Sequence, residues 1–236
     1  MREAKRLGAK TLSIVNVVGS SIARESDQVL YTWAGPEIAV ATTKAYTTQL
    51  ALLSLLALWM ARRLGTVSGE EFQAALAAFQ ELPGKMEEVL SRRDSIQYLA
   101  SRYFNHDSIF FIGRNLDYAL GLEGSLKLKE ISYIHSEAYA AGELKHGTIS
   151  LIEDGTLVVA LSTYGKLFSK AMSNVIEVKA RGADVLSLTV ESRGEEMRHT
   201  ADGVMSIPDI HELLLPCLWV VPLQLFAYYV ALMRPT

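Results

Sequence analysis

The sequence predicts an α/β protein built from doubly wound parallel sheets with helices on both faces. Short apolar runs rich in β-branched residues alternate with longer amphipathic stretches along the chain. Turn residues follow several of these runs, as at Gly19 and Gly113, which is typical of a buried strand that leads into a loop. Strands that alternate with helices in this way usually pair in parallel, because each crossover helix returns the chain to the same end of the sheet.

The expected elements are justified by these runs in chain order. The expected strands span residues 11–17, 29–32, 108–113, 156–162, 183–190 and 203–207. The expected helices span residues 2–10, 41–63, 68–82, 85–98, 116–133, 166–181 and 211–233. Pro83 and Gly84 should separate the helix that ends at residue 82 from the next one, because both residue types interrupt helices. No strand is expected in the polar segment 135–147.

The two halves of the chain differ in how complete they look. Residues 1–65 contain only two expected strands, which is few for a parallel sheet with helices on both faces. We therefore expect an incomplete first domain at residues 1–65, a helical linker at residues 66–100 and a second domain at residues 101–236.

The composition is that of a globular protein that binds no nucleic acid. Of the 236 residues, 50% are hydrophobic and 21% are charged, and the formal net charge is −3. Nucleic-acid binders usually carry a basic excess instead. Cys217 is the single cysteine, so no internal disulfide can form and a reducing compartment is the simpler interpretation. We expect Cys217 to be an inert core residue.

One uncharged stretch, residues 213–233, is long enough to span a bilayer. Pro216, Pro222 and Gln224 within it, and the lack of basic residues on its Glu212 side, argue against a membrane span. A helix buried on all sides in an α/β core gives the same pattern.

Small and hydroxyl-bearing residues gather in segment 34–49, at the start of a long expected helix. Free N–H groups at a helix start suit an anionic or hydroxylated ligand. Capping of the helix by Thr42 or Thr43 explains the same residues without a ligand.

A second candidate site lies on the expected helix 116–133. At about 100° per residue, Glu123, Lys127 and Glu130 fall on one narrow stripe, and leucine and isoleucine surround that stripe. A carboxylate beside an ammonium in an apolar cleft can act as a general base. The alternative is an ion-paired stripe that faces water.

His146 is the third candidate, because it follows Lys145 and precedes Gly147 in an expected loop. A histidine there could open a sugar ring by moving a proton, although a lone loop histidine is often a surface residue. No metal-ligand spacing and no dinucleotide or phosphate-loop glycine pattern is present, so no metal and no cofactor are expected.

Three runs carry a resemblance to a known family. They are residues 34–49, beginning Ala-Gly-Pro-Glu, residues 127–135, Lys-Leu-Lys-Glu-Ile-Ser-Tyr-Ile-His, and residues 137–147, Glu-Ala-Tyr-Ala-Ala-Gly-Glu-Leu-Lys-His-Gly. Together with residues 17–25 they resemble the isomerase portion of the glutamine–fructose-6-phosphate aminotransferase (isomerizing) family. The resemblance implies tandem sugar-isomerase (SIS) domains, of which the first is incomplete here, and it implies that residues 213–233 form a buried helix and not a membrane span.

The resemblance also implies roles for five residues. Glu130 matches the carboxylate that moves a proton between the first and second carbons of the sugar, and Lys127 matches a lysine of the same site. His146 matches the ring-opening histidine, which reaches the site from the neighbouring subunit. Val40 and Thr42 match residues that line the sugar.

The family converts fructose 6-phosphate and glutamine-derived ammonia to glucosamine 6-phosphate, in amino-sugar biosynthesis. The resemblance therefore implies a sugar-phosphate ligand, a cytoplasmic homodimer and, in the full enzyme, a glutaminase domain. The family's serine- and threonine-rich phosphate loops and its C-terminal tail are not in this sequence, so we expect this chain alone to be inactive. The alternative is a non-catalytic SIS module that binds a sugar phosphate.

Overall fold

The structure is a computed structural model that describes residues 1–234. The chain forms two compact units, which meet in the sequence between Ser68 and Gly69. Helices in the range 66–100 group with the second unit, and the predicted domain boundaries at residues 65 and 101 stay a prediction.

The first unit contains a small parallel sheet of two strands. Its elements are α1 (Arg2–Arg6), β1 (Leu12–Val15), α2 (Ser21–Glu25), β2 (Gln28–Tyr31) and α3 (Lys44–Leu64). Leu12 pairs with Gln28 and Val15 with Tyr31, so both strands lie where the sequence predicts them. Ser20 caps α2 by accepting a hydrogen bond from the Ala23 N–H, at 3.3 Å.

The second unit contains a parallel sheet of five strands. Its longer elements are α4 (Gly69–Ser91), α5 (Arg93–Tyr103), β3 (Ser108–Gly113), α6 (Leu116–Ser132), β4 (His135–Ala140), β5 (Leu157–Ser162), α7 (Phe168–Lys179), β6 (Asp184–Val190), α8 (Glu191–Arg198), β7 (Gly203–Ile207) and α9 (Leu215–Met233). Short 3₁₀ helices are η1 (Ala141–His146), η2 (Thr148–Leu151), η3 (Gly165–Leu167) and η4 (Glu212–Leu214).

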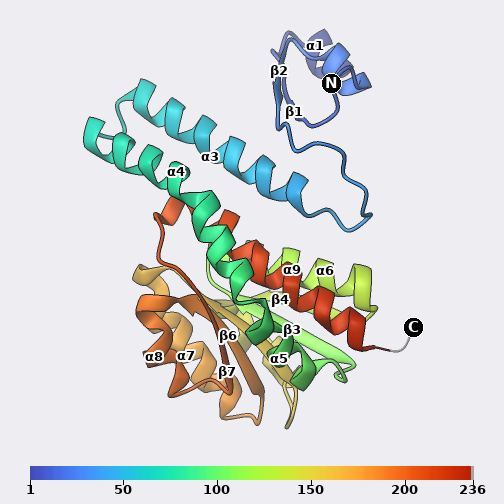
Figure 1. The fold of residues 1–236 in the computed structure, drawn as a ribbon, viewed down its shortest axis with the longest axis vertical. Coiled ribbons are helices and arrows are strands. Elements are labelled where there is room, and N and C mark those ends of the chain that lie inside the picture. The colour runs from blue at the N-terminus through green and yellow to red at the C-terminus, as the bar shows by residue number, and fades with distance from the viewer. Residues whose placement is uncertain (235–236) are drawn as a thin grey trace. The chain divides into compact units, whose positions relative to one another are not determined.

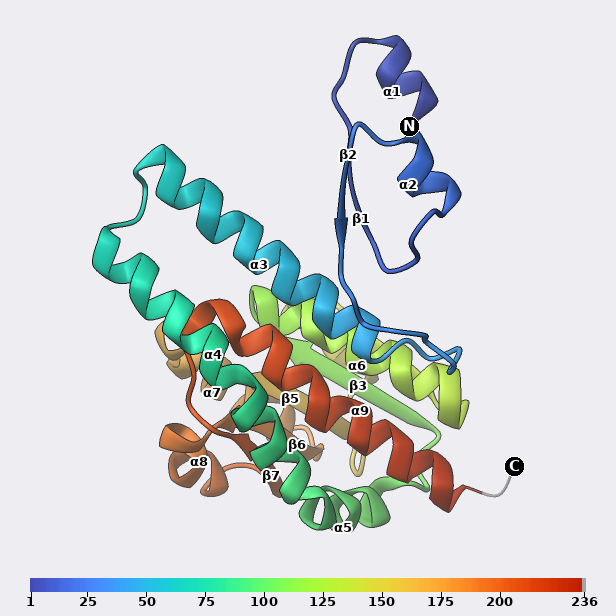
Figure 2. The same cartoon turned by 45° about the horizontal axis from the view of Figure 1, so that its top comes forward.

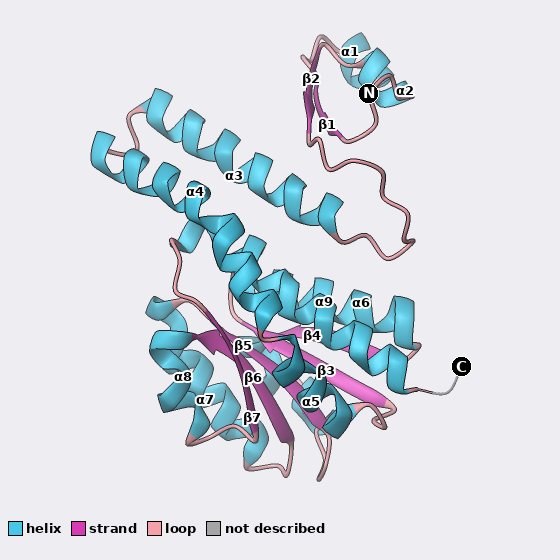
Figure 3. Ribbon diagram, in the orientation of Figure 1, coloured by secondary structure: helices cyan, strands magenta, loops and turns pink. Residues whose placement is uncertain are grey.

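The strand order of this sheet is β4-β3-β5-β6-β7, with every neighbouring pair parallel. From β3 the chain first moves outward to β4 and then returns to the other side of β3 at β5. Because parallel crossovers are right-handed, this reversal places α6 and α7 on opposite faces. Figures 1 and 3 show α6 and α9 on one face of the sheet and α7 and α8 on the other. This unit therefore has the doubly wound arrangement that the sequence predicts.

Helix α9 is the most apolar helix of the chain, and it packs against α4, α5 and α6 (Figure 2). Trp219, Phe226 and Val230 on this helix are fully buried. By length and composition, Glu212–Met233 is long and apolar enough to cross a membrane, but 61% of its apolar window is buried within the protein. Burial on this scale is typical of the core helix that the resemblance implies.

The expected helix break at Pro83 and Gly84 is wrong. Helix α4 continues through Pro83 to Ser91, and the chain changes direction at Arg92. A proline inside a helix removes one backbone hydrogen bond and crowds the carbonyl four residues earlier, and packing of the flanking residues can offset this cost. Leu82 and Val89, on either side of the expected break, are both buried.

Strand β4 and helix α8 were not predicted from the sequence. Strand β4 lies at the edge of the sheet and pairs only with β3, so it needs no continuous apolar run, and only Ser136 within it is fully buried. Helix α8 has eight residues, and only Gly194 and Met197 among them are buried. Both elements form because tertiary packing supplies what local sequence pattern lacks.

Candidate active site on helix α6

Helix α6 is held closely between the sheet and α9. A side chain at Gly124 would place its Cβ 2.8 Å from the Phe111 ring and 3.1 Å from Leu223, so only glycine fits there. At the next residue, the Ser125 hydroxyl and the Ser136 hydroxyl lie 2.8 Å apart, which links α6 to β4. These contacts fix the part of α6 that carries Lys127.

The stripe predicted from helical spacing is present. The Lys127 Nζ lies 2.6 Å from the Glu130 Oε2 and 3.4 Å from the Glu123 Oε1. The side chain of Lys127 is 4% exposed, that of Glu123 is 11% exposed and that of Glu130 is 29% exposed. The stripe is therefore not an ion pair on an open surface, and Glu130 is its most accessible member.

Burial affects the charge of Glu123 directly. It raises the pKa of the Glu123 carboxyl, and the attraction of the Lys127 ammonium partly opposes this effect. The carboxylates of Glu123 and Glu130 compensate the charge of the Lys127 ammonium between them. The Glu130 carboxylate can exchange a proton with a molecule that reaches it.

His146 is the last residue of η1, where its side chain is 76% exposed. Its Nε2 lies 3.9 Å from the Glu143 Oε2. Within residues 1–234 no hydrogen bond or ion pair joins His146 to Glu130, so the structure does not bring these two predicted residues together.

The two predicted sugar-lining residues, Val40 and Thr42, lie in the first unit, on the segment between β2 and α3. The side chain of Val40 is almost fully exposed. The predicted roles of all five residues, Val40, Thr42, Lys127, Glu130 and His146, stay predictions.

Comparison with known proteins identifies the family. A family model described as "SIS domain" matches residues 1–59 and 102–234. The chain belongs to the SIS domain family. The two matched ranges leave out α4 and most of α5, so each range carries one of the two parallel sheets.

Several sequence relatives of the chain share one name. Proteins named glutamine–fructose-6-phosphate aminotransferase [isomerizing] from Clostridium acetobutylicum and Thermus thermophilus are 52% and 47% identical to the chain, over 98% and 99% of its length. The chain spans 38% of the length of each of these relatives.

Solved SIS structures resemble the chain over nearly its whole length. The C-terminal domain of glucosamine-fructose-6-phosphate aminotransferase from Francisella tularensis is 34% identical, with a TM-score of 0.92 over 98% of this chain and 66% of that chain. A glucosamine-6-phosphate deaminase from Thermotoga maritima is 25% identical, with a TM-score of 0.68 over 98% of this chain and 64% of that chain.

A polar cluster that the sequence did not reveal lies at the carboxyl ends of β3 and β5, where the chain reverses direction across the SIS sheet. Asp117, in the first turn of α6, accepts hydrogen bonds from the Thr163 N–H at 3.0 Å and from the Thr163 hydroxyl at 2.6 Å. Asp117 is 2% exposed, and burial raises the pKa of its carboxyl to about 6. The sequence signal for this cluster was an aspartate four residues after Gly113, the glycine that ends β3.

This cluster occupies the place where open α/β sheets usually bind ligands. Here the Asp117 carboxylate already takes the donors that an anionic ligand would use. Arg114, three residues before Asp117, donates through Nε to the Asn174 Oδ1 at 2.9 Å. We therefore assign Asp117 and Thr163 a structural role.

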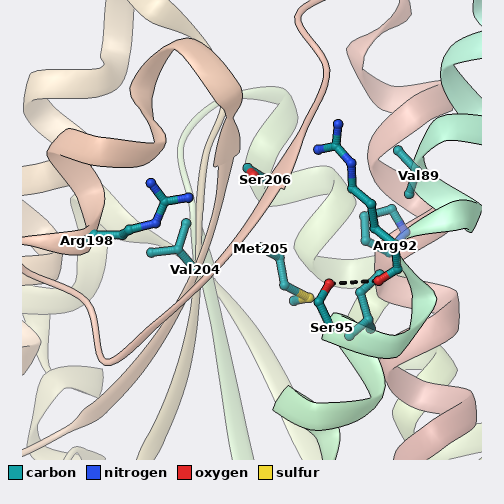
Figure 4. Close-up of a pocket in the computed structure, with 9 residues that line it drawn as sticks. Val89, Arg92, Ser95, Arg198, Val204, Met205 and Ser206 are labelled. Carbon is teal, nitrogen blue, oxygen red and sulfur yellow. Dashed lines mark hydrogen bonds between the residues drawn. The ribbon is translucent and has the colours of Figure 1, made fainter.

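A pocket of about 200 Å³ lies between the α4–α5 junction and strand β7 (Figure 4). Arg92 and Arg198 line it, but Arg92 pairs with Glu88 and Glu191, and Arg198 pairs with Glu195. Because both cations are already compensated, the pocket offers an anion little net attraction. None of the predicted site residues lines it.

No metal site is evident among residues 1–234, where no three histidine, cysteine, aspartate or glutamate side chains are placed to share an ion. Cys217 is fully buried, and burial raises the pKa of its thiol to about 11. A thiol with such a pKa is a poor nucleophile at neutral pH, so Cys217 is not a candidate catalytic residue.

Proposed function

We propose that this chain is the isomerase portion of a longer enzyme that converts fructose 6-phosphate and glutamine-derived ammonia to glucosamine 6-phosphate. The observation that carries the proposal is the buried Lys127 ammonium, 2.6 Å from the partly exposed Glu130 carboxylate. Relatives that are 47–54% identical to the chain are named glutamine–fructose-6-phosphate aminotransferase [isomerizing], and this name supports the same activity.

The proposed reaction moves one hydrogen between neighbouring carbons. Ammonia adds to the ketone at carbon 2 of the open sugar, and loss of water leaves an imine. The Glu130 carboxylate then removes a proton from carbon 1 and returns a proton to carbon 2, while the hydroxyl proton on carbon 1 passes to the imine nitrogen; together these transfers yield the aldehyde at carbon 1 and the amine at carbon 2. Lys127 keeps a positive charge beside the site while negative charge develops on the substrate.

His146 is proposed to open the sugar ring by proton transfer between the ring oxygen and the anomeric hydroxyl. Its exposed position on η1 suits a residue that enters the site of a neighbouring subunit in a homodimer. Val40 and Thr42 are proposed to line the sugar.

The same resemblance gives the wider assignment. We propose tandem SIS domains, the first of them incomplete in this chain, a glutaminase domain in the full enzyme and a cytoplasmic location. We expect this chain alone to give no turnover with fructose 6-phosphate and ammonium. The resemblance implies phosphate loops that this sequence does not contain, and binding energy from the phosphate normally holds the reacting carbon in place.

Glu130→Gln tests the proposal in a graft, in which this chain replaces the matching segment of the Clostridium acetobutylicum relative. We expect kcat to fall by about a hundredfold or more, because a general base contributes roughly that factor. Glu195→Gln is the control, since it removes a carboxylate that pairs with Arg198 on the surface of α8. The readout is glucosamine 6-phosphate formation.

Retained turnover in the Glu130→Gln graft would contradict the proposed role of Glu130. A graft that binds fructose 6-phosphate without turnover, whatever residue stands at position 130, would favour the non-catalytic sugar-phosphate-binding module instead.

A further inference from the structure

The position of His146 depends on how η1 is held. A 3₁₀ helix has three residues per turn, so Ala141 and Leu144 lie on the same face of η1. Both are buried, at 3% and 0% exposed, and they fix that face in the core. Lys145 and His146 lie on the two other sides of this 3₁₀ turn, where their side chains are 66% and 76% exposed.

A chain of polar contacts reaches this exposed side from helix α7. The Lys145 Nζ lies 2.8 Å from the Glu177 Oε1. The other oxygen of Glu177, Oε2, accepts a hydrogen bond from the Asn174 Nδ2 at 3.0 Å. The Asn174 Oδ1 in turn accepts from the Arg114 Nε at 2.9 Å. The contacts run without a gap from the β3–α6 loop, through α7, to the residue before His146.

The inner members of this chain have little freedom. Asn174 is 5% exposed, and both ends of its amide are used, so its orientation is determined. The Arg114 side chain also lies directly against η1, since a Cβ atom added at Gly142 would lie 3.3 Å from the Arg114 Nη1. The Lys145 ammonium holds the pKa of Glu177 below its usual range, so this carboxylate stays charged at neutral pH.

We infer that Glu177 is a positioning residue for His146. By holding Lys145 against α7, it fixes the last turn of η1 and hence the direction in which His146 projects. The inference rests on the proposed ring-opening role of His146. Lys145 is 66% exposed, and ion pairs this exposed change an equilibrium only by roughly twofold to fivefold, so Glu177 directs the turn without stabilising the whole fold.

Hydrogen exchange on the full chain tests the contact without any assumption about function. Glu177→Gln removes the charge that holds Lys145, while the glutamine oxygen still accepts from Asn174. Backbone amides of residues 143–147 should exchange roughly twofold to fivefold faster, with the thermal midpoint unchanged. Glu195→Gln, the matched control on α8, should leave these amides unchanged. Equal exchange in Glu177→Gln and the unmodified chain would overturn the inference.

Kinetics in the graft test the consequence for His146. Glu177→Gln should lower kcat by roughly twofold to fivefold and leave KM for fructose 6-phosphate unchanged, and adding Lys145→Gln should cause no further loss because both changes break one contact. A full additional loss in the double variant would also overturn the inference. Failure of the proposed function is seen separately, as a graft in which His146→Asn has no effect on turnover.

Discussion

The two ends of helix α6 both carry buried charge, but the charge is compensated in different ways. At the amino end, Asp117 has no ion pair within residues 1–234 and depends on the Thr163 N–H and hydroxyl. Further along the helix, ten residues after Asp117, the Lys127 ammonium lies between Glu123 and Glu130. One end uses neutral donors, and the other uses opposite charges.

The difference separates a structural cluster from a candidate chemical one. Both hydrogen-bond donors of Thr163, its N–H and its hydroxyl, are directed at Asp117, which is 2% exposed, so neither donor is left for a ligand. Glu130 instead keeps 29% of its side chain exposed while it contacts a buried ammonium. A perturbed carboxylate is therefore weak support for a function unless part of it stays accessible.

The largest expected effect comes from breaking the charged end. Lys127→Met leaves two carboxylates together without a cation, and loss of one partner of a buried ion pair costs about 3 kcal/mol. We expect the free energy of unfolding, measured with urea at pH 7, to fall by that amount. Lys129→Met on the exposed side of the same helix is the control, and it should change stability by less than about 0.5 kcal/mol.

Equal losses in the two lysine variants would mean that Lys127 is a surface residue in solution. The part of α6 around Lys127 would then carry no buried ion pair to compare with Asp117.

Sequence pattern predicted the strands of this fold well, and the reason is burial. Strand β3 matches the expected range, and β5 and β6 differ from theirs by one residue, because strands covered on both faces need continuous apolar runs. Strand β4 was missed because an edge strand with polar residues has no such run. The continuous helix through Pro83 was missed because a local rule for proline takes no account of packing on both sides of it.

For the candidate site, the helical period placed Glu123, Lys127 and Glu130 on one stripe, and the structure confirms their contacts. The burial of Lys127 could not be predicted, because it depends on the packing of α6 near Gly124. The Asp117 cluster was missed for a similar reason, since Asp117 and Thr163 are 46 residues apart and meet only through the order of the strands.

The neutral-donor end can be tested through pH. The pKa of Asp117 is about 6 in the folded protein and about 4 in an unfolded chain, so the folded state holds its proton more tightly. Stability should therefore fall as pH rises from about 4 to 6 and stay nearly level above that, with a total change of about 3 kcal/mol from this group, of which about 2 kcal/mol falls between pH 4.5 and 7. Asp117→Asn carries no titrating group and should lack this component.

The measurement is urea unfolding of both proteins at pH 4.5 and 7, with the wild-type change compared with that of Asp117→Asn. Identical pH dependence in the two proteins would show that Asp117 is as well solvated as an ordinary surface aspartate, contrary to its burial.

The smallest expected effect comes from removing one of the hydrogen bonds to Asp117. It tests whether that bond contributes more when the Asp117 carboxyl is ionised. Thr163→Val keeps the shape of the side chain but removes the hydroxyl that donates to Asp117 at 2.6 Å. Because that bond favours the ionised carboxylate, its loss raises the pKa of Asp117 further, and the cost of about 1 kcal/mol should be larger at pH 7 than at pH 4.5. Thr189→Val is the matched control, since its buried hydroxyl donates to the neutral Ser162 carbonyl at 2.9 Å. The control should lose the same stability at both pH values in urea unfolding. A Thr163→Val cost that does not change with pH would mean that Asp117 keeps one protonation state from pH 4.5 to 7, which would contradict the raised pKa on which the comparison of the two ends rests.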